Sequence, residues 1–364
     1  MTHLEQLIQD LCPNGVKRYK LKEIAEMQRG TSITKKDVVE GTIPVISGGK
    51  EPAYYCNTSN RDADVITVAG SGAGAGYVQY WEQPIFVCDS FSIKGKQDVS
   101  TKYLYYYLTN IQENIYATKK GGGVPHVHIS SIENFQIPLP PLAVQSEIVR
   151  ILDKFTLYKS ELAAELAARL QQYEYYRDQL LTFDDTVKRV KLGEVAELKA
   201  GSFVSRTELK DCSTNGFPCY GGNGIRGYVN HYSHEGSFSI IGRQGALCGC
   251  VHYATGKFYA TEHAVVVKTK ESVLSKYLYY VLVHANLNQY KSQGAQPGLA
   301  VSNLNQLVFP IPSLEVQERI VSILDRFDKL CHDIREGLPA EIDLRQKQYE
   351  HYRDRLLTFR QLGD

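Results

Sequence analysis

A twelve-residue segment occurs twice in this chain, and the duplication constrains the fold more than any other feature. Residues 172–183 are QYEYYRDQLLTF and residues 348–359 are QYEHYRDRLLTF, so the copies differ at two positions. A shorter match precedes each copy, because KYLYYYL at 102–108 recurs as KYLYYVL at 276–282. Matches in the same order indicate that one structural unit is present twice in tandem.

Each half of the repeat begins with a globular part in which strand patterns dominate. Short apolar runs bounded by Gly, Pro and Asp predict strands at 64–69, 84–88, 238–241 and 263–268. The segment that follows Ser100, up to residue 114, is typical of a helix with Ser100 as its N-cap. We therefore expect two α+β units with irregular sheets.

Further repeats lie at the start of each globular part. KLKEIAEMQRG at 20–30 matches KLGEVAELKAG at 191–201, and both predict a short amphipathic helix or turn that ends at glycine. The glycine pairs at 48–49 and 221–222 are counterparts in the same alignment.

Long helices are predicted after both globular parts, each entered through a proline-rich segment. Apolar residues recur there at spacings of three, four and seven, which is typical of a helical stripe. A helix of ~40 residues is about 60 Å long, too long for one small domain to cover. The stripes are therefore expected to pack together as an antiparallel coiled coil; the alternative is that each helix lies on its own domain. The predicted seam residues are Leu152, Phe155, Leu162, Leu166, Leu170, Tyr173, Leu180, Leu324, Phe327, Ile334, Leu338, Ile342, Tyr349 and Leu356.

The second helical stretch differs from the first by four extra residues and by a proline. Proline inside a helix removes a backbone hydrogen bond, so a kink is expected near Gly337–Pro339. The predicted parts are a first globular domain at 1–140, a first long helix at 141–185, a second globular domain at 186–312 and a second long helix at 313–364.

A circular relation links the two ends of the repeat. VKRYK at 16–20, before the first unit, matches VKRVK at 187–191, which follows the first long helix. The N-terminal segment is therefore expected to dock near the end of the second helix, which gives a pseudo-two-fold circular arrangement.

Composition excludes several classes of protein. No apolar run approaches the ~18 residues of a membrane span and the N-terminus does not resemble a signal peptide, so we expect a cytoplasmic protein without a membrane partner. The eight cysteines lack paired CxxC spacing, which favours reduced, packed thiols over a zinc site. The alternative zinc ligands would be Cys212, Cys219, Cys248, Cys250, His231 and His234.

No catalytic constellation is recognisable in the sequence. The Pro-Pro pair at 140–141 lies in LPPL and not in the tetrapeptide of an adenine methyltransferase. The glycine-rich segment 70–76 is followed by the strand-like YVQYW, whereas a nucleotide-binding loop requires a helix there. We interpret this segment and its match GRQG at 242–245 as turns between strands. No catalytic or metal-binding residues are predicted.

The junctions between globular parts and helices carry a family resemblance. LPPLAVQ at 139–145, IVRILD at 148–153 and YEYYRD at 173–178 recur as IPSLEVQ, IVSILD and YEHYRD in the second half. These motifs, and the duplicated order that covers essentially the whole chain, resemble the DNA-specificity subunit of type I restriction–modification enzymes.

The resemblance implies a non-catalytic subunit that binds double-stranded DNA. Each globular domain would be a target-recognition domain for one half of a bipartite site, and the helices would set the gap. The helices would also dock two methylation subunits, with restriction subunits as further partners. No cofactor is expected on this chain, because S-adenosylmethionine would bind the methylation subunits.

Candidate DNA-contacting residues are cations, amides and hydroxyls on glycine-containing loops. Residues 187–312 carry 13 Lys and Arg against 7 Asp and Glu, so the second globular part is basic. The tyrosines, by their helical spacing, are interpreted as packing residues. The candidates are Lys50, Ser71, Lys119, Lys120, His126, His128, Asn223, Arg226, Arg243, Gln244, Lys291, Gln293 and Gln296.

A second hypothesis explains the same architecture without DNA. In it the chain is a two-domain scaffold whose coiled coil binds protein partners and whose loops are merely solvated. Sequence preference in binding to random DNA separates the two hypotheses.

Overall fold

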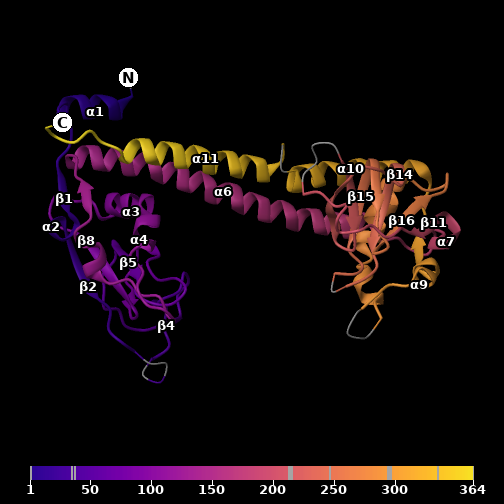
Figure 1. The fold of residues 1–364 in the computed structure, drawn as a ribbon, viewed down its shortest axis with the longest axis horizontal. Coiled ribbons are helices and arrows are strands. Elements are labelled where there is room, and N and C mark those ends of the chain that lie inside the picture. Colours follow the sequence, from indigo (N-terminus) through magenta and orange to yellow (C-terminus); the bar gives the residue numbers. More distant parts are fainter. Residues whose placement is uncertain are drawn as a thin grey trace. The chain divides into compact units, whose positions relative to one another are not determined.

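The computed structural model of the chain describes residues 2–33, 36, 38–211, 216–245, 247–292, 297–333 and 336–363. The chain forms two compact units: unit 1 comprises Met1–Ala163 with Ile342–Asp364, and unit 2 comprises Ala164–Glu341. Each unit combines strands and helices (Figure 1), which confirms the α+β class. The division falls inside the first long helix, so each unit includes part of it.

Unit 1 contains an antiparallel sheet in the order β2-β8-β5-β6. Every residue of the central strand β5 is buried, and β5 and β7 correspond to the strands predicted at 64–69 and 84–88. A second sheet has the order β4-β3-β7, and β1 pairs with β9. The bounds are β1 Arg18–Lys20, β2 Ala25–Arg29, β3 Ile43–Ile46, β4 Tyr54–Cys56, β5 Val65–Ala69, β6 Val78–Trp81, β7 Phe86–Val87, β8 Ser90–Gly95 and β9 Gln136–Pro138.

The helices of unit 1 are short except for those of the coiled coil. The Ser100 side chain accepts a hydrogen bond from Tyr103 N and caps α3, as predicted, but the helix is interrupted at Ile111 before α4 begins. The bounds are α1 His3–Leu11, α2 Leu21–Ile24, α3 Thr101–Asn110, α4 Gln112–Tyr116 and α5 Ile129–Ile132.

Unit 2 contains one six-stranded sheet in the order β11-β16-β14-β15-β12-β13, and β10 pairs with β17. The strands predicted at 238–241 and 263–268 are within β14 and β16. The bounds are β10 Arg189–Lys191, β11 Ala196–Ala200, β12 Phe217–Gly221, β13 Gly224–Val229, β14 His234–Gly242, β15 Val251–Ala260, β16 Ala264–Thr269 and β17 Val308–Pro310. The shorter helices are α7 Leu192–Val195, α8 Ser275–His284, η1 Leu287–Tyr290 and α9 Val301–Gln306.

The helix or turn predicted at 20–30 and at 191–201 is present only in the first half of each segment, and the prediction was wrong for the second half. Only Leu21–Ile24 and Leu192–Val195 are helical, and the next five residues form β2 and β11. These strands pair with β8 and β16 over their whole length. The partner strands are far away in sequence, so tertiary pairing overrides the local helical pattern.

The first long helix, α6, runs from Leu142 to Leu181 without interruption. Within unit 1 the Phe155 ring stacks on Tyr352 of α11, with ring centroids 5.4 Å apart. Within unit 2 Tyr173 contacts Phe327 of α10 at 6.4 Å, and Tyr176 stacks on the same ring. Residue numbers fall along the partner as they rise along α6, so the pairing is antiparallel. Every predicted seam residue within the described ranges is buried or half-buried; Ile334 lies outside them.

The second helical stretch consists of two helices, α10 Leu314–His332 and α11 Leu338–Leu357. Pro339 occupies the first turn of α11, where its missing N–H does no harm. A Cβ on Gly337 would lie 2.6 Å from Lys329 O, so the backbone at the break approaches the end of α10 too closely for any other residue.

The N-terminal segment docks where the circular match predicted. Val16 N donates to Arg360 O at 2.8 Å, and Leu362 N donates to Val16 O at 3.2 Å. Leu4 of α1 is buried in the same core as Leu357, and Figure 1 shows α1 beside the chain that follows α11. The segment that precedes the first repeat thus closes onto the end of the last helix.

The duplicated KYLYY motif joins each globular part to its long helix. In unit 1 Tyr103 OH donates to Pro138 O at 2.8 Å and Tyr106 OH donates to Asp153 Oδ1 of α6 at 2.5 Å. Burial and the nearby carboxylate raise the pKa of Tyr106, which keeps the hydroxyl protonated as a donor.

Unit 2 repeats these two hydrogen bonds. Tyr277 OH donates to Pro310 O at 3.0 Å and Tyr280 OH donates to Asp325 Oδ1 at 2.5 Å. The tyrosines of this motif therefore pack and orient the long helices, in agreement with their interpretation as packing residues.

The described cysteines, which exclude Cys212, are free thiols. In the ranges that the structure describes, no helix is both long and apolar enough to cross a bilayer.

Candidate nucleic-acid interface

Three loops of unit 1 meet at one end of the β5–β8 ladder. A Cβ on Gly48 would lie 2.3 Å from Ser71 O, so the first two loops touch backbone to backbone. Gly72 N donates to Pro125 O, and Val127 N donates to Gly70 O, both at 3.0 Å. The candidates predicted in unit 1 lie on these three loops, which we call the unit 1 loop cluster (residues 47–50, 70–76 and 119–128).

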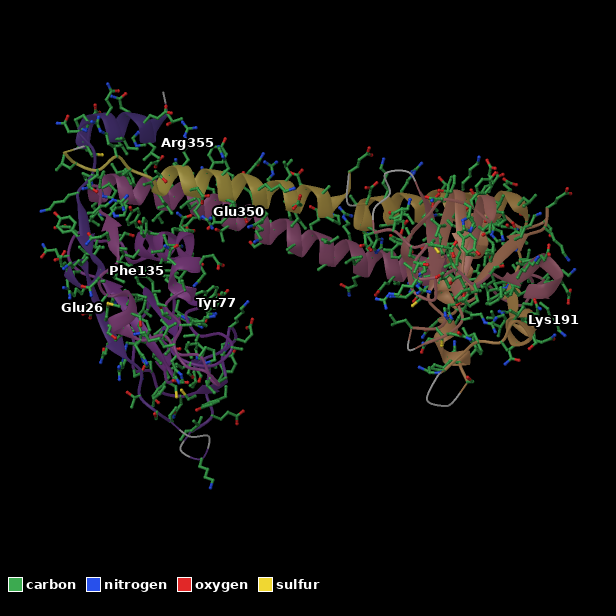
Figure 2. All side chains as sticks on the ribbon, viewed as in Figure 1. Glu26, Tyr77, Phe135, Lys191, Glu350 and Arg355 are labelled. Carbon is green, nitrogen blue, oxygen red and sulfur yellow. The ribbon has the colours of Figure 1, made fainter. Side chains whose placement is uncertain are left out.

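The cations of the unit 1 loop cluster are supported by aromatic rings. Lys119 Nζ lies 4.0 Å from the centroid of Tyr116. Lys50 Nζ lies 5.1 Å from that of Tyr77, which is labelled in Figure 2. Lys50 is exposed, so its ammonium group is available to an anionic ligand.

The third loop folds back on itself and displays two histidines. Lys120 N donates to His126 O at 2.9 Å and His126 N donates to Lys120 O at 2.8 Å. The rings of His126 and His128 stack with centroids 6.0 Å apart. His126 Nδ1 lies 2.8 Å from Val124 O, so Nδ1 is the donor nitrogen. Lys120 and His128 are exposed.

Ser71 has a partner that the sequence did not suggest. Its hydroxyl donates to the carboxylate of Asp89, and Gly70 N donates to Asp89 O at 3.1 Å. Asp89 is exposed and directly precedes β8. The sequence does show that Asp89 is a polar residue directly before a buried strand. No local pattern shows that it would contact the turn at Ser71.

In unit 2 three of the predicted candidates line an open cleft of about 620 Å³. Asn223, Arg226 and Gln244 are exposed there. His263 and Leu247 also line the cleft and were missed, because the strand pattern at 263–268 gave His263 a structural interpretation. The whole lining consists of Gly222, Asn223, Arg226, Gln244, Gly245, Leu247, His263 and Gly298.

Arg243 is not among the residues that line this cleft, and it is half-buried. Its backbone N donates to His263 O at 2.9 Å and its carbonyl accepts from Leu299 N at 2.8 Å. Among the described residues, Arg243 Nε and His263 Nδ1 are buried without a hydrogen-bond partner. His263 Nε2 lies 3.1 Å from Glu262 Oε1.

Lys291, the last described candidate, is exposed at the edge of unit 2. Its Nζ donates to Asn288 Oδ1 at 3.0 Å, and Asn288 Nδ2 in turn donates to Cys248 O at 2.7 Å. Gln293 and Gln296 lie outside the described residues.

His252 is a neutral element close to the cleft. A Cβ on Gly224 would lie 3.1 Å from His252 Cε1, so the imidazole packs directly under the turn between β12 and β13. Burial lowers the pKa of His252, which favours the uncharged ring at pH 7.

The two units build their turns with the same hydrogen bonds, which gives the register between them. Gly72 N donates to Pro125 O, and Gly245 N donates to Pro297 O at 3.1 Å. Ser71 forms a β-bridge with His126, as Gln244 does with Gly298. Ser71 is therefore the structural equivalent of Gln244.

The same register makes Asp89 the equivalent of His263. Gly70 N donates to Asp89 O, as Arg243 N donates to His263 O. It also pairs Gly48 with Gly222, since a Cβ on either would strike the carbonyl of the facing turn. The sequence match had paired Gly48 with Gly221, one residue earlier.

The segments considered for catalysis have structural roles. Gly70–Gly76 connects β5 to β6, and a strand follows it instead of a helix, as predicted. Among the residues that can be described, no three His, Cys, Asp or Glu side chains gather as metal ligands.

Large apolar side chains are exposed on the long helices. In unit 1 they include Leu157 and Tyr158 of α6 and Leu344 of α11, and in unit 2 they include Tyr175 of α6 and Leu330 of α10. A groove of about 920 Å³ adjoins Leu157 in unit 1.

Comparison with known proteins identifies relatives of the whole chain. A family model described as Type I restriction modification DNA specificity domain matches residues 13–172 and again 184–344. The chain is 45% identical to the type I restriction enzyme EcoprrI specificity subunit of Escherichia coli, over 69% of this chain and 67% of that protein. It is 30% identical to the EcoR124I/EcoR124II specificity subunit of Escherichia coli, over 99% and 97% respectively.

Solved structures share the fold. The crystal structure of a type I restriction–modification S subunit from M. genitalium has a TM-score of 0.65 at 18% identity and covers 94% of both chains. A chain from a structural study of complex assembly and conformational transition of the type I R-M system has a TM-score of 0.61 at 15% identity, over 95% of this chain and 98% of that one.

Proposed function

This chain belongs to the family of type I restriction–modification DNA-specificity subunits, and we propose that each of its two units contacts one half of a bipartite double-stranded target. The long helices set the number of base pairs between the halves. Lysines and arginines of the loops neutralise phosphates, and hydroxyl, amide and carboxylate groups at the turns meet base edges.

The observation that carries this proposal is the loop architecture that occurs twice with different side chains. Both units place a turn against a strand end with the same backbone hydrogen bonds. The side chains at equivalent points differ, with Ser71 in one unit and Gln244 in the other. A protein that recognises two different half-sites needs a common scaffold with different chemistry on it.

Methylation and cleavage belong to partner subunits in this proposal. The chain supplies sequence recognition and position, while S-adenosylmethionine binds the methylation subunits. We place the complex in the cytoplasm, together with the DNA that it recognises.

The partners are two methylation subunits, one for each unit, and restriction subunits join the assembly. Each unit has exposed apolar residues on its own pair of helices, which suits one docking event per unit. The groove beside Leu157 offers room for side chains of a partner in unit 1. A scaffold without DNA recognition is not favoured, because the curated relatives are specificity subunits.

Selection on random-sequence DNA tests the proposal. The chain is assembled with its methylation subunit, and bound duplexes are recovered and sequenced over several rounds. We expect two short preferred blocks separated by a fixed gap. Recovered DNA without sequence preference, at any salt concentration that retains binding, would contradict base recognition.

A further inference from the structure

Asp89 lies where the loops of the unit 1 loop cluster meet. The ladder pairs Ala69 with Ser90, so the residues next to this pair, Gly70 and Asp89, lie at the same end of the sheet. The Asp89 carboxylate accepts the hydroxyl of Ser71, and the side chain is exposed. A fixed, solvent-facing carboxylate is therefore present at the centre of a predicted DNA-contacting surface.

The charge of Asp89 is opposite to that of the lysine candidates around it. Lys50, Lys119 and Lys120 belong to the loops that Asp89 adjoins. A carboxylate repels phosphate oxygens, so it cannot contribute to backbone binding. The major groove does offer it a partner, since cytosine N4 and adenine N6 carry N–H donors there.

Unit 2 shows that the turn does not need this carboxylate. At the equivalent point it has His263, and the turn still forms with Gly245 N donating to Pro297 O at 3.1 Å. The residue at this point therefore varies while the backbone geometry is kept. That is the behaviour expected of a residue that determines specificity and not of one that holds the turn.

We propose that Asp89 is a specificity-determining residue, whose carboxylate accepts a hydrogen bond from the exocyclic amino group of a cytosine or adenine in the half-site of unit 1. Ser71 holds the carboxylate in place, because its hydroxyl donates a hydrogen bond to one carboxylate oxygen and leaves the other oxygen for the base. The inference rests on the proposed function, since it names the base chemistry that one unit selects.

The test uses the chain in complex with its methylation subunit and selection from random-sequence duplexes. Asp89→Ala should relax one base position in one half-site, with a loss of discrimination of roughly tenfold, and should leave the other half unchanged. In the wild-type site that position should show a clear preference for one base pair, whose cytosine or adenine amino group faces the major groove. An Asp89→Ala site identical to the wild-type site would overturn the assignment.

Two matched variants separate a direct contact from a general change in charge or in the turn. Asp62→Ala removes an exposed carboxylate at the other end of β5 and should leave all positions unchanged. Ser71→Ala keeps the carboxylate, so the preference should weaken but remain. If Ser71→Ala abolishes it as fully as Asp89→Ala does, the hydroxyl and not the carboxylate makes the contact.

His263→Ala tests the assignment to unit 1. It should leave the position that depends on Asp89 unchanged; if it relaxes that same position, the position is not specified by unit 1. Failure of the proposed function would look different, because the wild-type complex itself would then select no sequence.

Discussion

Substitution of Gln145 should clearly weaken the packing of α6 against the globular part of unit 1. Gln145 lies in the first turn of α6 and is only 1% exposed. Its Oε1 accepts from Ser100 N at 2.9 Å. Its Nε2 donates to Pro140 O at 2.8 Å and to Asp98 O at 3.2 Å. One side chain thus satisfies three backbone groups from the start of α3 and the start of α6.

Gln145→Ala leaves these three groups without that partner. A buried polar group that loses its partner costs about 1–3 kcal/mol, and water that enters the space recovers part of it. We expect unit 1 to lose about 3–5 kcal/mol of unfolding free energy. For a unit of this size that corresponds to a fall in melting temperature of roughly 6–20 °C.

The chain contains one tryptophan, which makes the assay specific. Trp81 lies in β6 of unit 1 and its indole N–H donates to Thr67 Oγ1 at 2.9 Å. Fluorescence during chemical or thermal unfolding therefore reports unit 1, whereas circular dichroism reports the whole chain. Gln145→Ala should shift the fluorescence transition.

Gln317→Ala is the matched variant in unit 2. Gln317 accepts from Leu274 N at 2.9 Å and donates to Pro312 O at 2.9 Å and to Ser272 O at 3.2 Å. It should shift the circular dichroism transition more than the fluorescence transition. Gln171→Ala, at an exposed position of α6, should shift neither. A Gln145→Ala shift as small as that of Gln171→Ala would refute the stated role of the buried amide.

Three further predictions concern DNA recognition. Insertion or deletion of four residues near Ala163–Ala168 changes the length of α6 by about 6 Å, so the selected gap should change by about two base pairs; an unchanged gap would show that α6 does not set it. Replacing residues 187–312 by the corresponding part of another specificity subunit should change one half of the selected target and keep the other. Arg243→Ala should weaken binding by ~1–3 kcal/mol; relaxation at one base position in the selection indicates a base contact, and an equal loss on all sequences indicates a phosphate contact.

The architecture could be predicted because the two halves of the chain can be compared with each other. The Leu152 to Leu180 stripe and the match of 16–20 with 187–191 defined the helix pair and the docking of the N-terminal segment. The position of Pro339 in the first turn of α11 follows from backbone chemistry alone. These features depend on periodicity, on proline or on the repeat itself, all of which are visible in the sequence.

Long-range pairing could not be predicted in the same way. Ala25–Arg29 has a helix-like pattern and becomes a strand because β8, more than sixty residues later, pairs with it. Asp89 and His263 were missed for the same reason, since their importance arises from the turns they face. A one-residue error in the glycine match, at Gly221 in place of Gly222, came from aligning letters where the hydrogen bonds define the register.

The two copies divide the residues of this chain into two classes. Tyr106 with Asp153 in unit 1 has an identical counterpart in unit 2, and Gln145 has Gln317; these residues hold the scaffold. Asp89 and Ser71 occupy points where the scaffold is equal and the side chains differ. Substitutions in the first class should lower stability and leave the selected bases unchanged. Substitutions in the second class should change the selected bases and leave stability unchanged. A Gln145→Ala complex that selects a new base, or an Asp89→Ala chain that unfolds early, would show that scaffold and recognition are not separable in this way.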